Sequence, residues 1–135
     1  MNVKSLGLAS LLIIANSFAT DLNPKFIKAI HQVESSGKLG NVIGDNGRAL
    51  GPLQIHRSYF QDAVQFDPSI KTGYNSVTNL SIATRVVSAY LKRYAPTAVK
   101  QNDYKTLARI HNGGPNGNNN PNTNKYWTKV SNHIK

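Results

Sequence analysis

Hydrophobic residues near the start of the chain recur with the period of an α-helix. Working back from Glu34 in steps of three and four residues meets Ile30, Ile27 and Phe26, so these side chains share one helix face. The pattern continues to about Ser36. It therefore predicts a helix that carries Glu34 on its buried side close to its C-terminal end.

The ends of this helix are also marked in the sequence. Asp21 or Asn23 can cap it, and Pro24 suits its first turn because the N–H that proline lacks would have no partner there. Gly37 stops it. The segment 37–51 that follows contains five glycines and a single short β-prone run, which predicts a small hairpin or an irregular β segment.

The rest of the chain has helical periodicity interrupted by proline and glycine. A second helix is expected to open at Pro52 and to run to Ala63, and the longest one spans Val77 to Tyr94, with Pro96 ending it. The remaining expected elements are a helix from Tyr104 to Ile110, a hydrogen-bonded loop rich in Asn, Gly and Pro over residues 116–124, and a short helix over residues 125–133.

The first residues have the features of an export signal. Lys4 gives a positive start, residues 6–15 are mostly apolar but short for a membrane span, and Ser17-Phe-Ala19 has the small-x-small pattern of a cleavage site. An uncleaved membrane anchor is the alternative. We expect a signal peptide over residues 1–19 and one domain over residues 20–135, secreted without stable membrane insertion into an extracellular, periplasmic or lysosomal space.

The charge and the composition of the chain limit the kinds of molecule that it is expected to bind. The chain has a formal charge of +10 and no cysteine, so it attracts anions and must be stabilised by packing without disulfides. Its basic residues are dispersed and form no stripe with interleaved aromatics, which argues against nucleic acid. Anionic polymers of a bacterial cell wall fit an exported cationic protein better, and we expect it to act as a monomer.

Several kinds of catalytic site are excluded because the chain lacks their sequence motifs. The chain has no His-Glu-x-x-His zinc motif, no phosphate-binding loop ending in Lys-Ser or Lys-Thr, and no Gly-x-Ser-x-Gly elbow. The four histidines, His31, His56, His111 and His133, are scattered singly and are expected to be structural or surface residues. We therefore expect no bound metal and no cofactor.

Carboxylate chemistry remains possible. Glu34 is the only glutamate of the chain, and burial on its helix face penalises the charged form, which suits a group that delivers a proton. Asp45 follows in a Gly-Asp-Asn-Gly turn. Cleavage of a glycosidic bond needs such a pair, one acid protonated and the other ionised. A surface glutamate and an ordinary turn aspartate are the alternative interpretations.

Several blocks of sequence, taken together and in this order, resemble the invertebrate-type (destabilase-type) lysozymes. The Glu-Ser-Ser-Gly to Gly-x-x-Gln-Ile arrangement is also similar to bacterial lytic transglycosylases, which share the wider lysozyme fold. The blocks are Val33-Glu-Ser-Ser-Gly37, Asp45, Gly51-Pro-Leu-Gln-Ile55, Tyr59-Phe-Gln-Asp62, the run from Ala83 to Ala95, Ala108-Arg-Ile-His-Asn-Gly-Gly-Pro115 and Tyr126-Trp127.

The resemblance implies a fold and an activity. The fold is α+β, mostly α and lysozyme-like, with a small β-hairpin region after the catalytic helix. The activity is hydrolysis of the β-1,4 bond between N-acetylmuramic acid and N-acetylglucosamine in bacterial peptidoglycan, a bacteriolytic and antimicrobial function. Glu34 corresponds to the general acid and Asp45 to the nucleophile or electrostatic partner. The expected substrate-binding residues are Gln54, Tyr59, His111, Asn112 and Gly113.

The chain departs from the family pattern in three places. Family members are rich in disulfides and this chain has none, and the segment between Asp45 and Gly51 is a residue shorter than usual. Some members also cleave isopeptide bonds with a serine just before the Gly-Pro block, but residues 46–50 contain no serine. Two other functions stay open: a lytic transglycosylase, which can do without Asp45, and an inactive cationic wall-binding protein.

Overall fold

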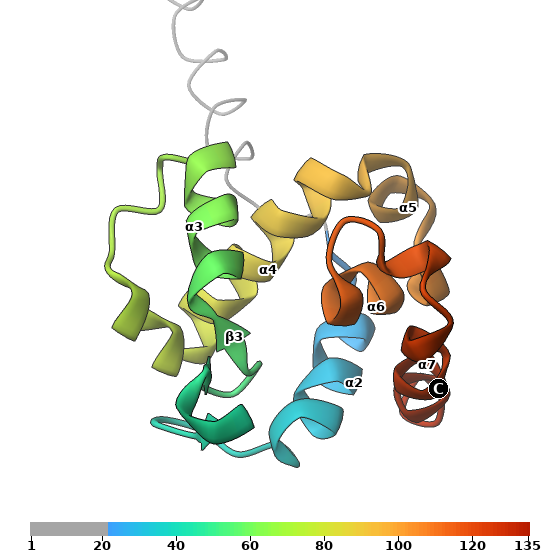
Figure 1. Ribbon diagram of the computed structural model, residues 1–135, viewed down its shortest axis with the longest axis horizontal. Coiled ribbons are helices and arrows are strands. Elements are labelled where there is room, and N and C mark those ends of the chain that lie inside the picture. The colour runs from blue at the N-terminus through green and yellow to red at the C-terminus, as the bar shows by residue number, and fades with distance from the viewer. Residues whose placement is uncertain (1–21) are drawn as a thin grey trace, which may run out of the picture.

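Helices surround a central helix, α4, and one small sheet lies beside them in the computed structural model, which describes residues 22–135 (Figure 1). The expected signal peptide, residues 1–19, lies outside the described residues. The helices are α2 (Pro24–Ser35), α3 (Arg57–Phe66), α4 (Leu80–Tyr94), α5 (Pro96–Gln101), α6 (Tyr104–Gly113) and α7 (Asn124–Ser131).

Helix α2 confirms the first prediction from the hydrophobic pattern. Asn23 is its N-cap and accepts a hydrogen bond from the Lys25 backbone N–H at 2.9 Å. Ser36 ends the helix in the left-handed conformation, with φ 56°. Phe26 and Ile30 are fully buried, so the apolar face packs into the core and holds the C-terminal end of α2 at a defined place.

The expected hairpin forms, and a third strand joins it. Strands β1 (Ile43–Gly44) and β2 (Ala49–Leu50) are antiparallel, and β2 pairs in turn with β3 (Ile55–His56). The prediction that a helix opens at Pro52 is wrong, because α3 begins only at Arg57. Sheet pairing outcompetes helix formation at residues 55–56, since it satisfies their backbone groups with β2.

Helix α4 is the centre of the core. Val86, Val87 and Leu91 are completely buried on it. The helix begins later than predicted because the Asn79 side chain caps it, accepting from the Ile82 N–H at 3.1 Å, and a separate 3-10 turn precedes it. Its end at Tyr94 is as predicted. The structure adds helix α5 directly after it, which the pattern did not predict.

The Asn-rich segment 116–124 is a hydrogen-bonded loop, as expected, built from two 3-10 turns. Thr123 is 1% exposed, and its hydroxyl donates to the Gly117 carbonyl at 2.8 Å and accepts from Arg109 Nε at 2.8 Å. A Cβ on Gly117 would lie 2.1 Å from the Arg109 carbonyl oxygen. Glycine therefore lets this loop pack directly against α6.

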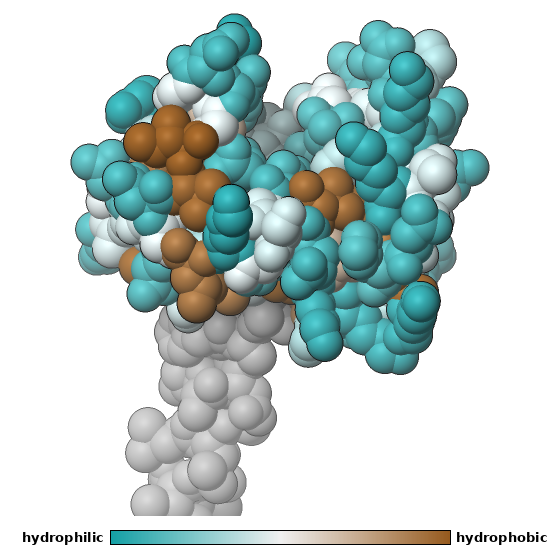
Figure 2. Space-filling view, turned by 90° about the horizontal axis from the view of Figure 1, so that it is seen from below, coloured by the Kyte–Doolittle hydropathy of each residue, from teal (hydrophilic) through white to brown (hydrophobic). Residues whose placement is uncertain are grey.

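Within residues 22–135, no helix has both the length and the apolar character needed to span a membrane. The face in Figure 2 is mainly hydrophilic, with apolar residues in small separate patches. The large apolar side chains that are most exposed are Leu39, Ile43 and Phe66.

Candidate active site

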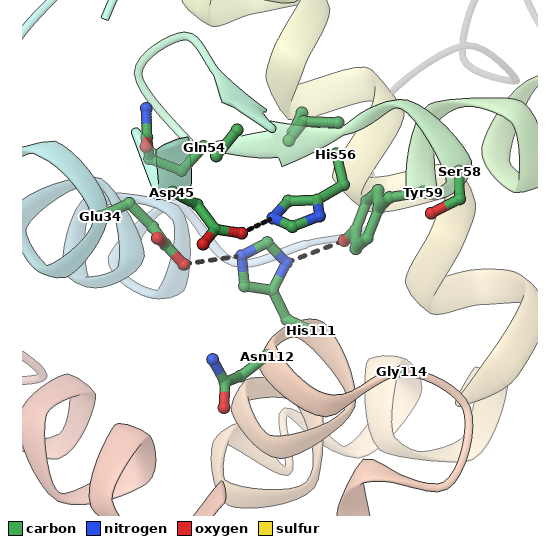
Figure 3. A pocket seen from close by; sticks show the side chains of 11 residues that line it. Glu34, Asp45, Gln54, His56, Ser58, Tyr59, His111, Asn112 and Gly114 are labelled. Atoms are coloured by element: carbon green, nitrogen blue, oxygen red, sulfur yellow. Dashed lines mark hydrogen bonds and ion pairs between the residues drawn. The ribbon is translucent and has the colours of Figure 1, made fainter. Parts of the chain in front are cut away.

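One pocket of about 400 Å³ collects most of the residues that the sequence singled out. Four parts of the fold contribute to it: the end of α2, the hairpin, the β3–α3 junction and the end of α6 (Figure 3). The lining residues are Glu34, Asp45, Ala49, Gln54, Ile55, His56, Ser58, Tyr59, His111, Asn112 and Gly114. Both candidate carboxylates therefore face the same space.

Glu34 is largely buried and is held on two sides. Its side chain is 19% exposed, and Oε1 accepts a hydrogen bond from the Tyr126 hydroxyl at 2.8 Å. The same oxygen lies 3.3 Å from His111 Nε2. The second carboxylate oxygen receives no hydrogen bond from these two groups, so it is the atom that can turn to a substrate.

His111 links Glu34 to Tyr59. The His111 side chain is only 4% exposed, and its Nδ1 lies 2.8 Å from the Tyr59 hydroxyl (Figure 3). Burial, and then the neighbouring Tyr90 and Glu34, raise the pKa of Tyr59 well above its ordinary value. Tyr59 thus keeps its proton at neutral pH. When it donates to Nδ1, the imidazole carries its proton on Nε2, directed at Glu34.

Tyr126 is a neutral hydrogen-bond donor for the same reason. Burial, the charge of Glu34 and their shared hydrogen bond raise the pKa of Tyr126 well above its ordinary value. The hydroxyl can donate to either protonation state of the carboxyl group. Tyr126 therefore fixes the orientation of Glu34 without carrying a charge of its own.

Asp45 has a different, wetter environment. Its side chain is 43% exposed, with Oδ1 3.0 Å from an Arg48 guanidinium nitrogen and Oδ2 3.1 Å from His56 Nε2. The backbone is in the left-handed region at Asp45 (φ 49°) and again at Asn46 (φ 55°). Residues other than glycine adopt this conformation at a cost, which is smallest for Asp and Asn.

Of the other residues predicted to bind substrate, some line the pocket and one does not. Gln54 and Asn112 line the pocket, but the Gln54 amide nitrogen already donates to the carbonyls of Val42 and Gly51, at 3.1 and 2.9 Å. Gly113, which was expected to bind substrate, is not among the residues that line the pocket. A Cβ on Gly113 would lie 2.5 Å from Thr123 Cγ2, so this glycine serves packing against the Asn-rich loop.

Several contributors to the site were not predicted from the sequence, and three of them have polar side chains. His56 and Ser58 line the pocket, and Tyr126 holds Glu34. His56 directly follows the Gly-Pro-x-Gln-Ile block, which is a local signal that could have drawn attention to it. Tyr126 comes from a segment 92 residues after Glu34, and nothing in the sequence indicates that the two meet. Among residues 22–135, no cluster of three or more His, Asp or Glu could hold a metal ion.

The wall of the pocket predicts a pH effect on stability. Tyr59 stacks on Tyr90, with ring centroids 3.6 Å apart, and burial, followed by the neighbouring Tyr94 and Asp62, raises the pKa of Tyr90 from 10.0 to about 12. Between these values the unfolded chain loses a proton that the folded chain keeps. Stability is therefore fully present below pH 10 and falls as the pH rises toward 12.

Replacing Tyr90 with phenylalanine removes this titration. We expect the free energy of unfolding of Tyr90→Phe to fall less steeply above pH 10, by up to about 1.4 kcal/mol per pH unit. Urea unfolding at a series of pH values from 8 to 11.5 measures it. Curves of equal slope for the two proteins would show that Tyr90 does not contribute.

A mostly helical fold with a small antiparallel sheet, and a pocket that one largely buried and one solvated carboxylate face, are the features that a protein of the lysozyme type would have. The Destabilase family model matches residues 24–133. The chain belongs to the Destabilase family.

Curated relatives support this assignment. The chain is 35% identical over 118 residues to Lysozyme 1 of Crassostrea virginica, covering 86% of this chain and 62% of that one. It is 32% identical over 127 residues to a lysozyme of Magallana gigas, covering 91% and 90%. The chain thus spans about three fifths of the length of the first relative and nine tenths of the second. Both relatives are named lysozymes.

Solved structures confirm the expected fold class. Tapes japonica lysozyme superposes with a TM-score of 0.66 at 26% identity, covering 83% of this chain and 90% of that one. Meretrix lusoria lysozyme, in complex with PliI of Aeromonas hydrophila, superposes with a TM-score of 0.67 at 26% identity, covering 84% and 92%. This chain has the same fold without any cysteine.

Proposed function

We propose that this protein hydrolyses the β-1,4 bond between N-acetylmuramic acid and N-acetylglucosamine in bacterial peptidoglycan. One observation carries the proposal: Glu34 and Asp45 face the same pocket from different surroundings, one largely buried beside the Tyr126 hydroxyl and the other solvated beside the Arg48 guanidinium. Glycosidases need this difference, because one carboxyl group must be protonated while the other is ionised. The lysozyme names of the relatives agree with it.

In the proposed reaction, Glu34 gives its proton to the glycosidic oxygen as the bond from that oxygen to the sugar carbon breaks. Positive charge develops on the carbon, and the ionised Asp45 stabilises it or bonds to it. Glu34, now ionised, takes a proton from water as the water oxygen attacks the same carbon and displaces the Asp45 carboxylate wherever that bond has formed. The products are two shorter glycans, and both carboxyl groups return to their starting states.

The surrounding residues would hold the acid and the sugars. Tyr126 and His111 orient the Glu34 carboxyl group, and Tyr59 orients His111 in turn. Asn112 offers its amide group, and Gln54 its amide oxygen, at the pocket to sugar hydroxyl and acetamido groups. No role in binding is proposed for Gly113, which packs against the neighbouring loop.

The charge of the chain fits the proposed substrate. A net charge of +10 attracts the protein to anionic wall polymers and raises its encounter rate with them. We propose that the protein is exported by its first 19 residues and acts as a bacteriolytic monomer in an extracellular, periplasmic or lysosomal space. The attraction should weaken with salt, because ions screen exposed charges.

The products of digestion test the function. Purified peptidoglycan digested by the wild-type protein should give soluble fragments that end in a reducing sugar, one water heavier than the anhydro products of a transglycosylase. Mass spectrometry distinguishes the two. Fragments with anhydro ends would show that the protein is a transglycosylase and not a hydrolase. Binding to the wall without release of any soluble fragment would show an inactive binding protein.

A further inference from the structure

A second pocket adjoins the proposed active site and is rich in positive charge. It has a volume of about 350 Å³ and is lined by Gly47, Arg48, His56, Arg57, Ser58 and Tyr74. Two of these residues, His56 and Ser58, also line the catalytic pocket. The two hollows are therefore parts of one continuous surface, and a substrate chain in the first can extend a substituent into the second.

The charge of this second pocket is not neutralised by its own walls. None of the described residues that line it is acidic. Asp45, at the border, contacts Arg48 and His56, so one carboxylate is shared between two of the three basic groups. Arg57 makes neither of these contacts. Its guanidinium lies over the Tyr74 ring, 4.4 Å from the centroid, which holds it in place and leaves its edge for hydrogen bonding.

Tyr74 is itself anchored. Its hydroxyl donates to the Ile55 carbonyl at 2.6 Å, at the strand that leads into the catalytic pocket. The guanidinium of Arg57 is thus supported by a ring that is tied to β3. A planar guanidinium with a fixed orientation suits a carboxylate, because the two groups form paired hydrogen bonds.

We propose that Arg57, with Arg48 and His56, forms a subsite for a carboxylate that the muramic acid unit of the glycan carries. This inference rests on the proposed function and identifies the carboxylate as the feature of the substrate that the protein recognises. Muramic acid bears a lactyl group, which ends in a carboxylate or in a stem peptide with carboxylates of its own. Chitin-type glycans carry neither. The subsite therefore favours peptidoglycan over neutral glycans of the same backbone.

The test compares two substrates and matched variants. Arg57→Gln should raise KM for soluble peptidoglycan fragments at least tenfold more than KM for chitin oligosaccharides of equal length. Arg85→Gln is the control, because it removes the same charge from an exposed side chain that contacts Ser69 and lines neither pocket. It should change either KM less than twofold. Assays at about 0.15 M salt limit long-range attraction.

The source of the carboxylate is distinguished by the fragments used. Glycans stripped of peptide by an amidase carry only the lactyl carboxylate, whereas intact fragments carry those of the peptide. Whichever fragment loses more affinity in Arg57→Gln identifies the group bound. Arg57→Lys keeps the charge and should recover part of the loss, which excludes a folding defect as the cause.

Two results would overturn the inference. One is an equal loss on peptidoglycan fragments and chitin oligosaccharides in Arg57→Gln, which would mean a structural role at the start of α3. The other is an equal loss in Arg57→Gln and Arg85→Gln, which would mean general attraction only. Calorimetric binding of peptidoglycan fragments to the Glu34→Gln protein, with and without Arg57→Gln, decides the subsite even if the wild-type protein cleaves neither substrate.

Discussion

Glu34→Gln is expected to lower the rate of peptidoglycan cleavage by about 1,000-fold or more, since general acid catalysis contributes roughly 10² to 10⁴ in rate and this variant has no proton to donate. A 1,000-fold loss corresponds to about 4 kcal/mol of barrier. Initial rates of release of soluble fragments from purified peptidoglycan measure it.

The same variant should fold normally. Glutamine has the shape of glutamate, and its amide oxygen can still accept the hydrogen bond that Tyr126 donates to Glu34 at 2.8 Å. The free energy of unfolding should therefore change by less than about 1 kcal/mol, comparable with one net hydrogen bond. A folded Glu34→Gln protein that clears bacterial walls at the wild-type rate would remove Glu34 from the mechanism.

Asp45→Asn tests the second carboxylate. Asparagine tolerates the left-handed backbone at this position, so the turn should persist, while the negative charge near the reacting carbon is lost. We expect kcat to fall by about 100-fold or more, or ~2.7 kcal/mol of barrier. Steady-state kinetics on soluble peptidoglycan fragments separate this loss in kcat from any change in KM.

The matched control for Asp45→Asn is Asp67→Asn. Asp67 lies just after α3, where its side chain accepts hydrogen bonds from Ser69, and it does not line the catalytic pocket. The same change of charge there should leave kcat within about twofold. A loss below tenfold in Asp45→Asn would show that this aspartate shapes the turn and takes no part in the chemistry.

Local signals made much of the fold predictable. Helix α2 was expected with nearly its observed bounds, because its apolar period, its cap and its first-turn proline all act within a few residues. The hairpin around Asp45 was expected from its glycines. Helix α3 was predicted too early, since residues 55–56 pair with a strand, and strand pairing depends on partners that a local pattern does not reveal.

The candidate site was only partly predictable for the same reason. Six of the predicted residues line one pocket, but Gly113 does not. The amide nitrogen of Gln54 donates hydrogen bonds to backbone carbonyls of nearby residues. His56 was expected to be a single structural or surface histidine. Its contact with Asp45 needs the third strand, which the pattern did not predict.

The sequence by itself determined the helix that carries Glu34, the turn that carries Asp45 and the cationic charge. The helix and the turn depend on residue spacing and turn residues within short stretches, and the net charge depends only on the amino-acid composition of the chain. Only the tertiary structure decided what surrounds the two carboxylates. Tyr59 meets His111 across 52 residues and Tyr126 meets Glu34 across 92. Such contacts form because buried helix faces pack against one another, and that packing depends on all of the elements together.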